Sequence, residues 1–247
     1  MNFSKILAIG KYSPDDILVS IARSNRKIDP EAESKIEAIW LEEKKRAEEA
    51  GKICYNGMQY RLNSIHADEN KIEVELGNID YKTVVALFKN PASENLAEEY
   101  QRKNCHVSVT ARTTDGKCVM VELSGKSMNS NTVDFLGGML ERPLEIKAGQ
   151  DIFQAAYSEM NEEAGIKQSD ILEIYLRAVL MLVKSTVCFY FEAKISMPSN
   201  ELQNRFEKSV RDQDIASLRF IDEKDYVEFL GQVNESKRFI GGVVMGE

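Results

Sequence analysis

The chain has 247 residues, 43% hydrophobic and 29% charged, a composition typical of a soluble globular protein rather than a disordered or membrane-spanning one. Its net charge is −8 and its pI is about 5.1. This acidity argues against a nucleic-acid polymer as partner, because such affinity comes largely from Lys and Arg neutralising phosphates. An acidic protein can still bind a small anionic substrate when a metal ion supplies the positive charge.

The cysteine pattern and the N-terminus indicate a reducing compartment. The four cysteines show no C-x-x-C spacing and the chain has only two histidines, so we expect no zinc site and free thiols. The apolar run at residues 6–9 is too short for a signal segment or a membrane span. These features predict a cytoplasmic protein with no membrane partner.

The chain divides near residue 100, which predicts an N-terminal α+β module over residues 1–100 and a second domain over residues 101–247. In the module, Ile28-Asp29-Pro30 opens a predicted helix that ends near Gly51, with proline at its start, where a missing N–H costs nothing. Three short strands are predicted next, at residues 58–62, 71–76 and 80–85. No catalytic constellation is visible in this module.

The second part predicts a strand at residues 106–113, a hairpin turn at Asp115-Gly116 and a returning strand at 117–123. Residues 91–102 connect the two parts, and residues 124–131 are polar. Beyond residue 170, the pattern predicts further elements: strands at 174–183 and 187–195, a helix at 201–210, a strand at 218–221 and a final helix at 223–230.

The octapeptide at 159–166 carries three carboxylates, Glu159, Glu162 and Glu163, at positions i, i+3 and i+4. In a helix they fan out on one side of an apolar stripe centred on Met160. Like charges at this spacing repel by a few tenths of a kcal/mol. A hard divalent cation would reverse the sign, because Mg²⁺ prefers carboxylate oxygens and leaves positions for substrate phosphates. The alternative is an ordinary solvated helix face.

The residues upstream favour the metal site over the solvated face. Asp134–Glu141 predicts a strand that runs into a Gly137-Gly138 turn, and a loop follows. Asp151 is predicted to cap the helix, with Gln154 completing an approximate capping box. Gly165 is expected to end the helix in the left-handed backbone conformation.

Strand, Gly-Gly turn, loop and a helix bearing E-x-x-E-E-x-G together resemble the Nudix box of the Nudix hydrolases. The resemblance implies an α/β/α sandwich around a mixed sheet, which suits the predicted order of hairpin, helix, hairpin, helix. Three departures from the box stand out. Gln150 replaces a glutamate, Ser158 replaces the arginine before the first metal-binding glutamate, and Gly138 fits the opening glycine only with about six extra loop residues.

The N-terminal module resembles that of a Nudix subfamily that cleaves UDP-glucose and UDP-galactose to UMP and the sugar 1-phosphate. The matching segments are short: residues 36–40, 55–57, 60–62, 76–77 and 81–82. The alternative is that Trp40, Tyr60 and Leu62 are core residues and that Asn56-Gly57 is a turn.

The resemblance implies that one to three Mg²⁺ ions, or Mn²⁺, bind Glu159 and Glu163, with Glu162 as a further ligand or base. Gly138 would supply backbone near the metal, and Glu141 would add a carboxylate. Candidate contacts for phosphate or sugar are Arg112 and Arg142, together with Arg177 and Lys184, although the ordinary interpretation of each is a surface cation.

The predicted function is therefore hydrolysis of a nucleoside diphosphate sugar, with UDP-glucose or UDP-galactose preferred. One alternative is a Nudix hydrolase that acts on ADP-ribose or a dinucleotide. The other is a Nudix-fold module that binds nucleotides or partner proteins without hydrolysis. Gln150 and Ser158 favour the module, and the retained carboxylate set opposes it.

Overall fold

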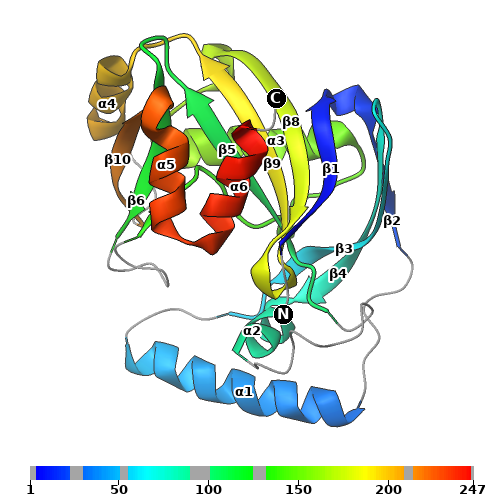
Figure 1. The fold of residues 1–247 in the computed structure, drawn as a ribbon. Coiled ribbons are helices and arrows are strands. Elements are labelled where there is room, and N and C mark those ends of the chain that lie inside the picture. Colours follow the sequence, from blue (N-terminus) through cyan, green and yellow to red (C-terminus); the bar gives the residue numbers. More distant parts are fainter. Residues whose placement is uncertain are drawn as a thin grey trace.

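The structure is a computed structural model that describes residues 4–22, 30–50, 55–89, 101–124, 132–208 and 214–245. Its larger sheet has the order β1-β8-β9-β5-β6-β10, with β7 paired to β6, and its smaller sheet has the order β2-β4-β3 (Figure 1). The strands are β1 (Lys5–Tyr12), β2 (Ile17–Ile21), β3 (Met58–Ala67), β4 (Ile72–Asp80), β5 (Cys105–Arg112), β6 (Lys117–Leu123), β7 (Val133–Asp134), β8 (Ile171–Met181), β9 (Val187–Ile195) and β10 (Ile215–Asp222). The helices are α1 (Pro30–Glu49), α2 (Tyr81–Lys89), α3 (Gly149–Ala164), α4 (Ser199–Lys208), α5 (Glu223–Val233) and α6 (Glu235–Met245).

The larger sheet is mixed, because β5 runs parallel to β9 while β8 and β6 are antiparallel to their neighbours. The register of β5 with β6 covers only residues 111–112 of β5. Beyond that point the chain after β7 lies along β5. The N–H groups of Val109 and Val107 donate to the carbonyls of Leu136 (2.7 Å) and Gly138 (2.9 Å). Residues 134–141, here called the bridging segment, thus continue the sheet where β6 leaves β5.

Helices cover both faces of the larger sheet (Figure 1). Side chains alternate along β5, so Val107 and Val109 join the core cluster that contains Phe153 of α3. Thr110 points the other way, and its hydroxyl lies 2.7 Å from that of Tyr226 on α5. The predicted α/β/α sandwich with a mixed sheet is confirmed.

The two sheets share one hydrophobic cluster. Ile17, Leu62 and Ile72 of the smaller sheet are buried in the same cluster as Val107 and Phe153. In addition, β1 pairs with β8 and so belongs to the larger sheet, which the sequence pattern did not indicate. The division of the chain near residue 100 stays a prediction.

The strand predicted at residues 80–85 is wrong, because α2 begins at Tyr81. The β-branched run Thr83-Val84-Val85 favours a strand locally, but Asp80 starts a helix. Its carboxylate accepts the N–H of Thr83 (3.0 Å), and the side-chain oxygen of Asn56 accepts the N–H of Lys82 (2.7 Å). These side chains satisfy N–H groups that a helix start leaves without partners. Asn56 therefore has a structural role at the start of α2, while the structure assigns no turn to Asn56-Gly57.

The predicted cap of α3 is displaced by three residues. The helix begins at Gly149, and Asp151 is its third residue rather than its N-cap. The Asp151 carboxylate reaches back to the N–H groups of Lys147 (2.7 Å) and Ala148 (2.9 Å). Gly165 does end the helix in the left-handed conformation, with φ 71° and ψ 19°, as predicted.

The helix at 223–230 is not the last one, because α6 follows it. Gly241-Gly242 and Val243 disfavour a helix, and the helix forms because Ile240 and Val243 are buried in the cluster on that face of the sheet. The connecting stretch at 91–100, the polar stretch at 125–131 and residues 209–210 lie outside the described residues.

The three cysteines that the structure describes, Cys105, Cys118 and Cys188, are free and buried, as predicted for thiols. Burial raises the pKa of Cys118 and of Cys188 to about 12 in each case. Within the described part of the chain, no helix has the length and apolar character needed to cross a membrane.

Gly165→Ala is expected to lower the free energy of unfolding by about 1 kcal/mol, because a Cβ disfavours the left-handed conformation. Gly231→Ala is the matched control: this glycine lies inside α5, and a Cβ there meets no atom within 4 Å. The control is expected to be neutral or slightly stabilising, since alanine is the better helix former. Urea denaturation of both variants measures the difference, and equal effects would contradict the assignment of the α3 terminus.

Candidate active site

The apolar face of α3 fixes the direction of its carboxylates. Ile152, Phe153, Ala156, Met160 and Ala164 are fully buried. Phe153 packs edge-on against Phe191 of β9, with ring centroids 4.9 Å apart. This anchors the helix, so Glu159 and Glu163 lie half-buried along its flank, as the predicted apolar stripe requires.

Both half-buried carboxylates contact the glycine pair of the bridging segment. The N–H of Gly137 donates to Glu163 Oε2 (2.8 Å). A Cβ at Gly138 would overlap the carboxylate of Glu159, and a Cβ at Gly137, where φ is 156°, would overlap the carbonyl oxygen of Val107. Glycine at both positions therefore lets the backbone lie directly against the two carboxylates.

Glu162 does not join this group, because its side chain is exposed. No group of three or more His, Cys, Asp or Glu side chains with metal-binding spacing occurs among the described residues. The site therefore offers two hard carboxylates, Glu159 and Glu163, one helical turn apart. That donor set fits Mg²⁺, which proteins commonly hold through one or two carboxylates while substrate phosphates complete its coordination.

Glu141 and Arg142 lie at the far end of the bridging segment, where β3 holds them. Glu141 accepts hydrogen bonds from the amide of Gln59 (2.8 Å) and the hydroxyl of Tyr55 (3.4 Å). The Arg142 guanidinium lies over the ring of Tyr60, 5.0 Å from its centroid. Glu141 is three residues beyond Gly138, roughly 10 Å for an extended chain.

The structure does not bring Arg112 to the carboxylate pair. It lies at the end of β5 on the α5 side of the sheet, whereas Val107 and Val109 face α3. Its guanidinium forms ion pairs with Glu192 (2.6 Å) and Glu223 (3.0 Å). Lys184 is also engaged elsewhere, with its ammonium 3.9 Å from the ring centroid of Phe88.

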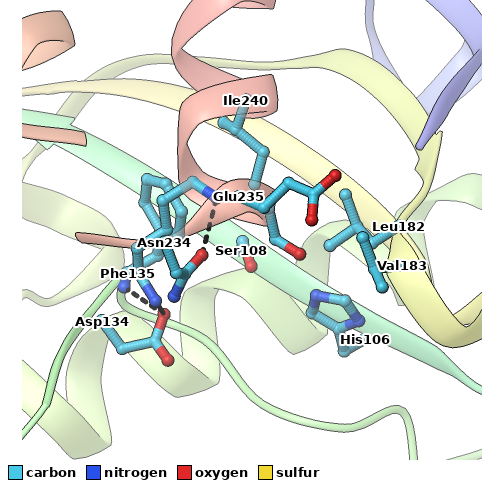
Figure 2. Close-up of a pocket in the computed structure, with 11 residues that line it drawn as sticks. His106, Ser108, Asp134, Phe135, Leu182, Val183, Asn234, Glu235 and Ile240 are labelled. Carbon is cyan, nitrogen blue, oxygen red and sulfur yellow. Dashed lines mark hydrogen bonds and ion pairs between the residues drawn. The ribbon is translucent and has the colours of Figure 1, made fainter. Parts of the chain in front are cut away.

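A cavity of about 320 Å³ opens on the α6 side of the sheet. Figure 2 shows side chains from β5, the bridging segment and the start of α6 converging on it. It is lined by His106, Ser108, Asp134, Phe135, Leu182, Val183, Asn234, Glu235, Ser236, Lys237 and Ile240. The sequence predictions missed this cavity because they missed α6. The sequence feature that could have indicated the cavity is Asp134-Phe135, which lies one residue before the Gly-Gly pair.

An ion pair between a buried lysine and a partly exposed aspartate joins the bridging segment to α6. The Lys237 ammonium lies 2.9 Å from Asp134 Oδ1, and the lysine side chain is 8% exposed. The same Asp134 oxygen accepts the N–H of Phe135 (2.8 Å). The segment thus forms the cavity wall at Asp134 and Phe135 and meets the carboxylates at Gly137 and Gly138. In an extended chain, Phe135 and Gly138 are roughly 10 Å apart.

His106 presents a neutral imidazole at the cavity wall. Its Nδ1 is buried and has no hydrogen-bond partner among the described residues. Burial lowers the pKa of His106 to about 4; Asp134 opposes this change, while Arg102 and Lys237 add to it. The ring is therefore uncharged at neutral pH.

Comparison with known proteins gives a fold likeness only. No protein-family model matches the chain, and no curated protein is similar to it in sequence. Similar solved structures include a Nudix hydrolase from Nitrosomonas europaea, with TM-score 0.37 and 16% identity over 57% of this chain and 85% of that one. The protein DR0079 from Deinococcus radiodurans gives TM-score 0.39 and 16% identity over 63% and 86%.

A third similar structure is the Nudix domain of NrtR from Shewanella oneidensis in complex with ADP-ribose. Its TM-score is 0.41 and its identity 10%, over 62% of this chain and 92% of that one. TM-scores below 0.5 at such low identity assign no activity. The functional inference therefore depends on the residues of this chain.

His106 is expected to make stability depend on pH. Between about pH 6.5 and 4 the unfolded chain binds a proton that the folded imidazole does not, so stability falls as pH falls through this window. His106→Asn is expected to reduce that slope, because it removes the group whose pKa differs between the folded and unfolded chain. Urea denaturation at pH 7, 6 and 5 measures the slope. A His106→Asn protein with the wild-type slope would contradict the neutral, buried imidazole.

Proposed function

We propose that this protein is a Mg²⁺-dependent Nudix pyrophosphatase that hydrolyses a nucleoside diphosphate sugar. The observation that carries the proposal is the contact of Glu159 and Glu163, from an E-x-x-E-E-x-G helix, with Gly137-Gly138. The cavity at the other end of the same segment adds a binding site for the nucleoside.

The carboxylate pair has a defined task in such a reaction. Glu159 and Glu163 would hold the cation, and the Gly137 N–H fixes the orientation of Glu163. When bound there, Mg²⁺ would neutralise pyrophosphate oxygens and lower the pKa of the attacking water. Gly138 lets the backbone lie against the Glu159 carboxylate, because it has no side chain. Glu162, exposed next to the pair, is the remaining candidate base.

The cavity suits a nucleoside in size and lining. Its volume of about 320 Å³ lies at the lower end of the range for small-ligand pockets. Phe135, Leu182 and Ile240 provide an apolar surface, while His106 and Asn234 offer polar atoms. Phe135 on the cavity wall and Gly138 beside the carboxylates are three residues apart, roughly 10 Å in an extended chain.

The preference for UDP-glucose or UDP-galactose comes from the resemblance of the N-terminal module. The structure gives several of those residues structural tasks: Asn56 caps α2, Trp40 packs edge-on against Tyr81 at 6.0 Å, and Tyr60 and Leu62 are buried. ADP-ribose and dinucleotides therefore remain alternative substrates. Candidate contacts for the sugar phosphate are Glu141 and Arg142.

A second function, nucleotide binding without hydrolysis, is favoured by one observation. Glu162 is exposed and does not complete a cluster of three acidic side chains within the described part of the chain. Ser158, which replaces the arginine of the Nudix box, also favours binding without hydrolysis.

Purified protein with Mg²⁺ is expected to convert UDP-glucose to UMP and glucose 1-phosphate. The measurement is product analysis over a panel of UDP-sugars, ADP-sugars, ADP-ribose and dinucleotides. Equal rates for UDP-sugars and ADP-sugars would refute the preference for uridine but not the proposed hydrolysis. If the whole panel gives no product but UMP still binds, the non-hydrolysing function stands and the enzyme proposal fails.

Glu159→Gln and Glu163→Gln are each expected to reduce kcat/KM at least about 100-fold, the upper end of what losing a supporting group around a metal costs. Unfolding free energy should change by less than about 1 kcal/mol, because the side chains lie at the solvent edge. Glu207→Gln, an exposed carboxylate on α4, is the control and should retain wild-type kcat/KM. Retained activity in either α3 variant would refute the metal-ligand assignment.

Ser236→Trp tests the place of the nucleoside. The larger side chain would occupy part of the cavity, so KM is expected to rise about 10-fold while kcat changes little, the pattern for lost uniform binding. Gln232→Trp, on the exposed side of α5, adds the same bulk outside the cavity. Steady-state kinetics of the two variants should separate them, and an unchanged KM in Ser236→Trp would place the nucleoside elsewhere.

A further inference from the structure

Tyr60 of β3 is 1% exposed, and its hydroxyl reaches the loop that joins the bridging segment to α3. The hydroxyl donates to the carbonyl of Leu144 (2.9 Å) and accepts the N–H of Ile146 (3.0 Å). A hydroxyl has one donor and two acceptor positions, so both bonds can exist together. One buried side chain thus fastens the loop at two points.

The entry to the loop is tied to the same strand. The Tyr60 N–H donates to the carbonyl of Leu140 (2.8 Å), and the Arg142 N–H donates to the carbonyl of Met58 (2.9 Å). The Arg142 guanidinium covers the Tyr60 ring on the outside. From Leu140 to Ile146, the course of the loop is therefore set by β3, which lies far from it in sequence.

The two ends of this loop carry the two halves of the candidate metal site. Gly137 and Gly138 precede it, and α3, with Glu159 and Glu163, begins at Gly149. A connection of this length has considerable conformational freedom when nothing orders it. A catalytic or metal-binding site also works less well when the residues that support it let its groups deviate by about 1 Å from the productive geometry. The geometry of the carboxylates against the glycine pair therefore depends on what holds the loop.

We propose that Tyr60 is a positioning residue that holds the loop between the glycine pair and α3, so that the smaller sheet sets the geometry of the metal site. The proposal rests on the proposed function, because that function makes Glu159 and Glu163 metal ligands. Tyr60 acts through the loop and does not contact the substrate. The smaller sheet then supports the metal site irrespective of which base or sugar is bound.

The test compares Tyr60→Phe with Tyr12→Phe. Tyr12 of β1 is equally buried, at 1% exposed. Within the described part of the chain its hydroxyl also has backbone partners, because its single O–H donates to the carbonyl of Ile9 (3.0 Å) or to that of Asp68 (3.1 Å). Each variant loses one hydroxyl and its backbone bonds, so their melting temperatures should fall by similar amounts. The measurements are Mn²⁺ affinity, from the electron paramagnetic resonance signal of free Mn²⁺, and hydrogen exchange at the Ile146 amide.

Tyr60→Phe is expected to weaken Mn²⁺ binding about 10-fold, the low end for loss of a group that supports metal ligands, and to speed exchange at Ile146. Tyr12→Phe should change neither quantity. Equal Mn²⁺ affinities in the two variants would overturn the proposal, even if exchange at Ile146 is faster in Tyr60→Phe. Failure of wild-type protein to bind Mn²⁺ would instead refute the proposed metal site itself. Mn²⁺ binding without turnover would refute hydrolysis and leave the role of Tyr60 measurable.

Discussion

The constraint on which the candidate site depends is the close approach of a peptide backbone to two carboxylates. Gly137 and Gly138 lie against Glu163 and Glu159, and no side chain fits at either glycine. Two like charges one helical turn apart are unfavourable by themselves. The Gly137 N–H offsets part of that cost, and a bound cation would offset the rest. Glycine in the segment and carboxylates on the helix are therefore parts of one arrangement.

The bridging segment is where distant parts of the chain meet. Its start is held by Lys237 of α6, its middle by β5 and Glu163, and its end by Gln59 of β3. Because β6 diverges from β5, the segment has access to both faces of the sheet. The cavity on the α6 face and the carboxylates beside α3 thus share a backbone of eight residues.

The sequence predicted those features that local patterns determine. The apolar stripe of α3, the half-buried Glu159 and Glu163 and the stop at Gly165 follow from helical geometry and from the conformational freedom of glycine. The helix at 81–89 was missed because its β-branched run suggests a strand, and the side chains of Asp80 and Asn56 decide otherwise. Helix α6 was missed because burial on the sheet outweighs its weak propensity, and the cavity with Lys237 was missed with it. Ion pairing of Arg112 with Glu192 and Glu223 likewise depends on tertiary contacts.

The position of β1 has a consequence for the order in which the chain acquires its structure. Lys5 lies opposite Met181, so β1 pairs with a strand that is synthesised much later. Pairing between strands so far apart in the chain is slow, because a large loop must close, with loss of entropy, before the stabilising contacts form. During synthesis the edge of β1 stays without its partner until β8 emerges from the ribosome. Until then, the unpaired backbone N–H and C=O groups along this edge can pair with other nascent chains.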